Sequence, residues 1–162
     1  MQSAGQLVNS PISNLELVFT GDSAAMIAAR DRVMDFLHEQ GISEQEEIDI
    51  LVALQEALVN AVVHGCKNDP SQVIHCSAEV DVEAITIVIK DPGEGFDTVG
   101  ACDSTEGGTN LTEHGRGICL MRSLMDKVSY SHGGSQVHLT KRRAPADTVP
   151  AILPPVSPHA EI

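Results

Sequence analysis

The stretch LVALQEALVNAVVHG, residues 51–65, decides the fold of this 162-residue chain. Within it, Glu56, Asn60 and His64 recur every four residues, so they share one face of a helix. Apart from Gln55, the rest of the stretch is apolar or glycine, which predicts a helix that is almost entirely buried. A buried carboxylate and a buried amide need a partner or a ligand, and an asparagine oxygen can bind a hard cation such as Mg²⁺. The stretch therefore predicts a core helix that carries a polar site.

Helix and strand signals on either side of this stretch predict one α+β domain. Residues 43–46, Ser-Glu-Gln-Glu, form a capping box, so the helix should begin there and run to about His64. An earlier helix, residues 24–40, follows a turn and ends at Gly41. Alternating patterns predict strands at residues 15–20, 73–80, 84–90, 128–131 and 136–141, and a further helix at residues 117–126. We expect a two-layer sandwich, in which a mostly antiparallel mixed sheet is covered on one face by about three helices.

Composition divides the chain into three parts. We expect a flexible N-terminal segment at residues 1–14, a folded domain at residues 15–142 and a proline-rich, disordered tail at residues 143–162. Residues 91–117 are rich in Gly, Asp, Thr and Asn and have little periodicity. A loop of that length inside a compact domain is often a functional lid.

The charge of the chain limits its partners. The formal net charge of −13 would repel nucleic acid phosphates and anionic membranes, so we expect no direct nucleic acid and no membrane as partner. A basic or neutral protein partner stays open. No apolar stretch reaches the length of a membrane span, and the N-terminus has no basic region followed by an apolar one. These features predict a cytoplasmic protein.

The cysteines give no sign of a metal site or a disulfide framework. Four of them are scattered without a CxxC pair, and in a domain of this size we expect reduced thiols: Cys66, Cys76, Cys102 and Cys119. His64, Cys66, His75 and Cys76 are zinc-ligand types. Neither pair has the usual finger spacing, so zinc is not expected.

A second candidate site is DPGEGF, residues 91–96, which follows a predicted strand directly. Most Pro-Gly turns only connect elements. Here Asp91 stands at the strand end, where its carboxylate could accept a hydrogen bond from a ligand amine. Gly93 and Gly95 would let the backbone approach a flat ring.

A third candidate site is HGRGI, residues 114–118, which opens a predicted helix. Free N–H groups at a helix N-terminus bind phosphate, and glycines permit close approach. Arg116 is either a phosphate contact or a surface residue. His64 also keeps two interpretations: it caps the C-terminus of its helix, or it contacts Glu56 or a phosphate.

The three sites together resemble those of a known superfamily. In chain order, Glu56-x-x-x-Asn60-Ala61-x-x-His64, then Asp91-Pro92-Gly93-x-Gly95, then Gly115-x-Gly117 resemble the N box and the two glycine boxes of the GHKL ATPases. The single-domain length, the strand–helix lead-in and the phrase GICLMRSLMD, residues 117–126, are most similar to the anti-sigma factor serine kinases of the RsbW and SpoIIAB type. The resemblance covers roughly residues 15–141. It implies a Bergerat-type fold, with ATP and Mg²⁺ as cofactors.

The resemblance also implies a function for each matching residue. Glu56 corresponds to the general base, Asn60 to the Mg²⁺ ligand and Asp91 to the carboxylate that reads the adenine amino group. Residues 98–114 correspond to the ATP lid, and the other implied nucleotide contacts are His64, Gly93, Gly95, Thr109, Gly115, Arg116, Gly117 and Ile118. The implied reaction transfers the γ-phosphoryl group to a serine of a STAS-type anti-anti-sigma partner. The other implied partners are a sigma factor and a second copy of the chain in a homodimer.

One position departs from the family pattern and leaves two functions open. The SpoIIAB-like kinases have an arginine shortly before the second glycine box, where this chain has Glu113 and His114. If Arg116 does not reach the γ-phosphate, ATP could bind without phosphoryl transfer. Glu56 favours a serine kinase, whereas the missing arginine favours an ATP-dependent module that sequesters a regulator. A histidine kinase fragment is disfavoured, because the region before residue 15 is too short for a dimerisation helix.

Overall fold

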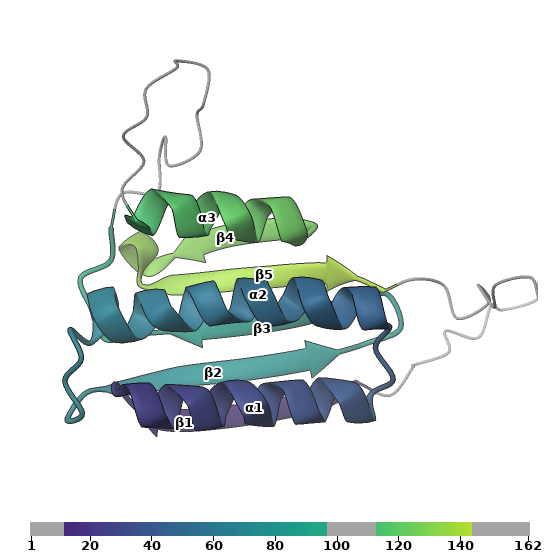
Figure 1. Cartoon of the computed structure of the whole chain (residues 1–162), viewed down its shortest axis with the longest axis horizontal. Helices are drawn as coiled ribbons and strands as arrows, with labels where there is room; N and C mark the ends of the chain where they lie inside the picture. Colours follow the sequence, from purple (N-terminus) through teal and green to yellow (C-terminus); the bar gives the residue numbers. More distant parts are fainter. Residues whose placement is uncertain (1–11, 97–112, 144–162) are drawn as a thin grey trace, which may run out of the picture.

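The computed structural model describes residues 12–96 and 113–143. They form two layers, an open five-stranded sheet and three α-helices that all lie on one face of it (Figure 1). The expected α+β architecture is confirmed. The strand pairings in this part of the chain are all antiparallel, without the parallel pair that a mixed sheet would include.

The sheet has the strand order β1-β2-β3-β5-β4. Its strands are β1 (Ser13–Thr20), β2 (Val73–Val80), β3 (Ala84–Lys90), β4 (Lys127–Ser131) and β5 (Gln136–Arg142). The helices are α1 (Ser23–Glu39), α2 (Glu44–Asn60) and α3 (Glu113–Leu124), with a π-helix η1 (Ala61–Gly65) and a 3-10 turn η2 (His132–Gly134). Residues 97–112 lie outside the described residues, and with them nearly all of the expected lid, including Thr109.

Side-chain caps fix where the first two helices begin. The N-cap of α1 is Asp22, whose carboxylate accepts hydrogen bonds from the Ala24 and Ala25 N–H groups. The expected capping box of α2 is confirmed, because the Ser43 N–H donates to the Glu46 carboxylate at 2.6 Å and the Glu46 N–H donates to the Ser43 hydroxyl. Each cap satisfies N–H groups that have no partner inside the helix. The start of α2 is therefore set by local sequence.

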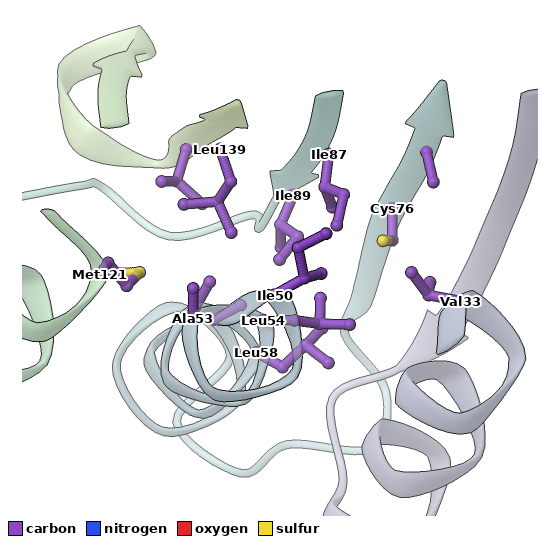
Figure 2. Close-up of a cluster of buried hydrophobic side chains, with 14 of the residues drawn as sticks. Val33, Ile50, Ala53, Leu54, Leu58, Cys76, Ile87, Ile89, Met121 and Leu139 are labelled. Carbon is purple, nitrogen blue, oxygen red and sulfur yellow. The ribbon is translucent and has the colours of Figure 1, made fainter. Parts of the chain in front are cut away.

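The core lies between α2 and the middle of the sheet. Ile50, Leu54 and Leu58, spaced by four, are fully buried. Figure 2 shows them within one cluster that also contains Ile87, Ile89 and Leu139 of the central strands, with Ile50 directed toward Ile87 and Ile89. This packing also explains one departure from expectation. The helical segment Glu44–Gly65 is long and apolar enough to cross a membrane by length and composition, whereas no such segment was expected, and its apolar face here packs on the sheet.

The opposite face of α2 is more open than the sequence indicates. Glu56 and Asn60 are half-buried and His64 is exposed. Leu51 keeps 38% of its surface exposed, although it was expected to join the apolar face. The polar stripe therefore faces a surface that a ligand or a partner can reach.

The cysteines differ in state. Cys66 and Cys76 are buried free thiols, as expected. Cys119 on α3 is disulfide-bonded, so the expectation of a reduced thiol is wrong for this residue. Cys102 lies outside the described residues. Among the described residues, no cluster of three or more His, Cys, Asp or Glu side chains is placed to hold a metal ion.

An ion pair joins the two layers beneath α3. Lys141 of β5 donates to the Asp49 carboxylate of α2 and to the Leu124 carbonyl at the end of α3, each at 2.7 Å. Both charged side chains are more than four-fifths buried. The Lys141 hydrogen bond holds the pKa of Asp49 below its usual value. The pair therefore ties two helices to one strand.

We expect Asp49→Asn to lower the free energy of unfolding at neutral pH by about 1–3 kcal/mol, because it leaves a largely buried ammonium group without its counter-charge. Since the pKa of Asp49 is lower in the folded protein than in the unfolded chain, the ion pair stabilises the fold above the unfolded pKa, and this stabilisation is lost as the pH falls through the folded pKa. Urea unfolding over an acidic pH series should therefore show wild type and variant converging. Asp35→Asn, at an exposed aspartate of α1, is the control. A difference in unfolding free energy between wild type and Asp49→Asn that does not depend on pH would contradict this account.

Candidate functional site

The site begins where α2 changes its helical pitch. After Asn60, the chain continues as the π-helix η1, in which the Cys66 N–H donates to the Ala61 carbonyl at 2.8 Å. Single π-helical turns are rare and occur often at functional sites. The turn brings Gly65 so close to Asp91 that a Cβ at Gly65 would overlap the Asp91 carboxyl group. Only glycine fits at this contact between η1 and the end of β3.

Asp91 is held from two sides. Its N–H donates to the Ser135 carbonyl at 3.0 Å, and its carboxylate accepts a hydrogen bond from the Gly93 N–H at 2.8 Å. Burial raises the pKa of Asp91, and the Gly93 hydrogen bond acts in the opposite direction. A half-buried carboxylate with one oxygen engaged has acceptor capacity left for a ligand N–H.

The loop after Asp91 is fastened to the turn η2. The Phe96 N–H donates to the Gly133 carbonyl at 3.0 Å. Gly95 has a φ of 77°, and a Cβ there would overlap the same carbonyl. Glycine is therefore required at position 95 both by conformation and by space. The two hydrogen bonds, at Asp91 and at Phe96, place the loop beside the ends of β4 and β5.

These elements enclose a cavity of about 290 Å³. Of the residues that the sequence singles out, the structure brings four into its wall: Asn60, His64, Asp91 and Gly95. The rest of the wall is mainly apolar and comes from α2, η1, the ends of the strands and the glycine loop: Ala57, Ala61, Gly65, Ile89, Phe96, Tyr130, Gly134 and Val137. A flat, largely apolar ligand with an amine at its edge fits such a wall.

Several wall residues were not found from the sequence. Tyr130 and Phe96 come from β4 and from the loop, and their rings make an edge-to-face contact with centroids 5.4 Å apart. Gly134, in the turn η2 between β4 and β5, also lines the cavity. The alternating pattern of a strand indicates which side of the sheet a residue faces. It does not indicate which end of β4 borders a cavity.

Glu56 lies one turn before Asn60, outside the wall of this cavity. It lines a second cavity, of about 530 Å³, between α1 and α2. A Cβ placed on Gly117 would lie 2.7 Å from the Glu56 carboxylate and 3.9 Å from the Asn60 amide nitrogen. Gly117 is therefore the point at which α3 approaches the polar face of α2. The carboxylate stands between the two helices and beside an open groove.

The second glycine segment is placed differently from expectation. α3 begins at Glu113, four residues before the expected start, so Gly115 and Gly117 lie within the helix. Gly115 is buried, Arg116 is exposed and Ile118 is fully buried in the core. Neither Arg116 nor Ile118 lines the cavity. The positive end of the α3 dipole lies at Glu113 rather than at Gly117, so an anion would be attracted to the start of the helix at Glu113.

Two other predicted residues, Gly93 and His64, line an adjoining cavity, and His64 also lines the first one. Gly93 lines an adjoining cavity of about 550 Å³, on the far side of Gly65. His64 borders both cavities and also lies in the last turn of η1. Both interpretations of His64, as a helix cap and as a ligand contact, are therefore compatible with its place.

Comparison with known proteins finds an anti-sigma factor and a serine-protein kinase among the similar proteins. An anti-sigma F factor of Anoxybacillus flavithermus is 30% identical over 141 residues, which cover 82% of this chain and 97% of the relative. A serine-protein kinase RsbW of Staphylococcus aureus is 37% identical over 101 residues, which cover 57% of this chain and 64% of the relative. The solved structure of the RsbU and RsbW domains of Rv1364c from Mycobacterium tuberculosis superimposes with a TM-score of 0.53 at 18% identity. It covers 83% of this chain and 34% of that one, and supports the fold alone.

The family model with the description "Histidine kinase-like ATPase domain" matches residues 19–141. The match begins near the end of β1 and ends in β5, so it includes the three α-helices and the strands β2, β3 and β4 in full. It also includes Glu56 and Asn60 of α2, and Asp91, which directly follows β3. The chain belongs to the histidine kinase-like ATPase domain family.

Proposed function

We propose that this protein is an ATP-dependent protein-serine kinase that acts as an anti-sigma factor and phosphorylates a serine of a STAS-type anti-anti-sigma partner. One observation carries the proposal: a half-buried carboxylate and an amide, Asp91 and Asn60, share one cavity, and Glu56 stands one helical turn away beside an open groove. The named relatives support both activities, because one is an anti-sigma F factor and the other is a serine-protein kinase.

The adenine base enters the 290 Å³ cavity in this proposal. Its exocyclic amine donates to Asp91, and its ring faces contact the apolar wall at Ile89 and Val137. The close contact with Gly65 and the Gly93 hydrogen bond fix the direction of the carboxylate before the ligand arrives. Such preorganisation lowers the entropic cost of binding.

The phosphates extend from the cavity along the polar face of α2 toward α3. Asn60 lies on this path, and the first-turn N–H groups of α3 lie beyond it. Asn60 would hold Mg²⁺ through its amide oxygen together with phosphate and water oxygens, and the described residues have no cluster of three or more His, Cys, Asp or Glu side chains that would bind the ion without a nucleotide. When bound, the ion neutralises phosphate charge in the transition state.

Glu56 acts as the general base for the partner serine. The carboxylate accepts the hydroxyl proton as the serine oxygen bonds to the γ-phosphorus, while the bond from that phosphorus to the β–γ bridging oxygen breaks and ADP leaves. The groove between α1 and α2 gives a protein substrate access to Glu56 without crossing the nucleotide cavity. The sigma factor and a second copy of the chain complete the proposed set of partners.

A second function has an observation of its own. Arg116 is exposed and lies outside the cavity wall, and Glu113 and His114 stand at the start of α3 where the related kinases have an arginine. If no cation meets the γ-phosphate, the protein binds ATP and sequesters a regulator without phosphoryl transfer.

The first test of catalysis is a transfer assay with ATP labelled at the γ-phosphate and the STAS proteins of the same genome. We expect label to move to one of them, and Glu56→Gln to lower the rate roughly a hundredfold or more while ADP affinity is kept. Glu39→Gln, at an exposed glutamate at the end of α1 that does not line the groove, is the control and should transfer normally. Tight ATP binding without transfer to any partner would reject the kinase and leave the sequestering module.

The nucleotide site has a separate test at Gly65. We expect Gly65→Ala to weaken ADP binding about tenfold or more, because the added methyl group overlaps the Asp91 carboxyl and displaces it from the adenine amine. Isothermal titration calorimetry measures the affinity. In the control Gly41→Ala, the new side chain meets no atom within 4 Å at a residue far from the cavity, so stability should change and ADP affinity should not. Unchanged affinity in Gly65→Ala would remove Asp91 from the adenine site.

A further inference from the structure

Tyr130 is a polar residue in the cavity wall to which the proposed function assigns no part. It pairs with Val137 across β4 and β5, and side chains that oppose one another in an antiparallel pair lie on the same face of the sheet. Val137 is buried on the face that the helices cover and lines the same cavity. The Tyr130 ring contacts Phe96 edge to face, with an interplanar angle of 76°. Tyr130 thus lies between Phe96 of the loop that follows β3 and Val137 of β5.

The hydroxyl group of Tyr130 is buried and has no hydrogen-bond partner in the described part of the chain. Buried polar groups are nearly always paired, so an unpaired one in a native protein calls for an explanation. Burial also raises the pKa of Tyr130 to about 12, so the hydroxyl keeps its proton at neutral pH and can donate. In the free protein this group lowers stability, because a phenylalanine would fill the same space without an unsatisfied hydroxyl.

We propose that the Tyr130 hydroxyl donates a hydrogen bond to the nucleoside part of the bound nucleotide, and that the protein tolerates the unpaired group for this purpose. The inference rests on the proposed nucleotide site. The nucleoside is favoured over the phosphates because Tyr130 shares its cavity with Asp91 and with apolar residues, whereas Arg116 of α3 lies outside it. The acceptor is a purine ring nitrogen or the oxygen of a ribose hydroxyl group.

Binding must also move the wall. The hydroxyl has almost no solvent-accessible surface in the free protein, so the surrounding side chains have to shift before a ligand atom can reach it. Phe96 is half-buried and contacts the ring, which makes it the neighbour whose shift most directly uncovers the hydroxyl. Tyr130 is the only tyrosine, and the chain has no tryptophan, so its intrinsic fluorescence reports this movement directly.

The test is Tyr130→Phe with two readouts. We expect ADP affinity to fall roughly five- to tenfold, as for one lost hydrogen bond, while the unfolding midpoint of the nucleotide-free protein stays the same or rises. A purely structural tyrosine would give the opposite pair of results. The matched control is Ser129→Ala on the other face of the same strand, which should leave ADP affinity unchanged.

Analogues of ADP locate the acceptor. The affinity of wild type and of Tyr130→Phe is measured for 7-deaza-, 3-deaza-, 1-deaza-, 2′-deoxy- and 3′-deoxy-ADP. We expect one of these analogues to bind both proteins equally well, because that analogue has lost the accepting atom. In wild type, saturation with ADP should change the tyrosine fluorescence.

Three outcomes would overturn the inference. The first is equal ADP affinity in wild type and Tyr130→Phe, and the second is a loss of stability in the nucleotide-free variant. The third is an affinity difference between wild type and Tyr130→Phe that persists with every analogue, which would place the acceptor on the phosphates. Failure of the wild-type protein to bind ADP at all would instead reject the nucleotide site itself. Calorimetry on wild type therefore separates failure of the proposed function from failure at Tyr130.

Discussion

The packing of α2 on the central strands is the interaction on which the rest of the structure depends. Ile50, Leu54 and Leu58 are fully buried between the helix and the sheet, and full burial of each such side chain contributes about 1.5–3 kcal/mol. Because a helix repeats every 3.6 residues, fixing this face also fixes the opposite one. Glu56 and Asn60 are consequently aimed away from the core. The same contacts that stabilise the fold orient the polar groups of the site.

Close approach of backbones then completes the site, and glycine permits it at each contact. Gly65 touches the Asp91 carboxyl group, Gly95 touches the turn η2, and Gly117 touches the Glu56 carboxylate. At all three positions a side chain would occupy the space that a functional group or its support now holds. The site is therefore built from segments that are distant in sequence and meet without intervening side chains.

Much of this arrangement could be predicted from the sequence, because its signals are local. The capping box at Ser43, the apolar spacing of α2 and the turn after Asp91 each depend on residues within a few positions. They place Asn60 and Asp91 in one cavity once the sheet forms. No local signal gives the order of the strands, which depends on pairings between distant segments.

What could not be predicted depends on contacts between distant segments. The π-helical turn after Asn60 has no signal in composition, and its close approach to Asp91 joins segments that are distant in sequence. The start of α3 at Glu113 was missed because His114-Gly-Arg-Gly has low helix propensity, which the packing of α3 on α2 overcomes. Tyr130 was missed because only the pairing of β4 with β5 carries it to the cavity.

The central claim is that Asp91, held by Gly65 and Gly93, reads the amino group of adenine. It is tested most directly by calorimetric titration of the protein with ADP and with purine riboside diphosphate, which differ only in that a hydrogen replaces the exocyclic amine of adenine. The account predicts that ADP binds at least about tenfold more tightly, because the carboxylate accepts a hydrogen bond from the amine and loses it with the second nucleotide, and that Asp91→Asn narrows this preference. Equal affinity for the two nucleotides, or an unchanged preference in Asp91→Asn, would contradict it.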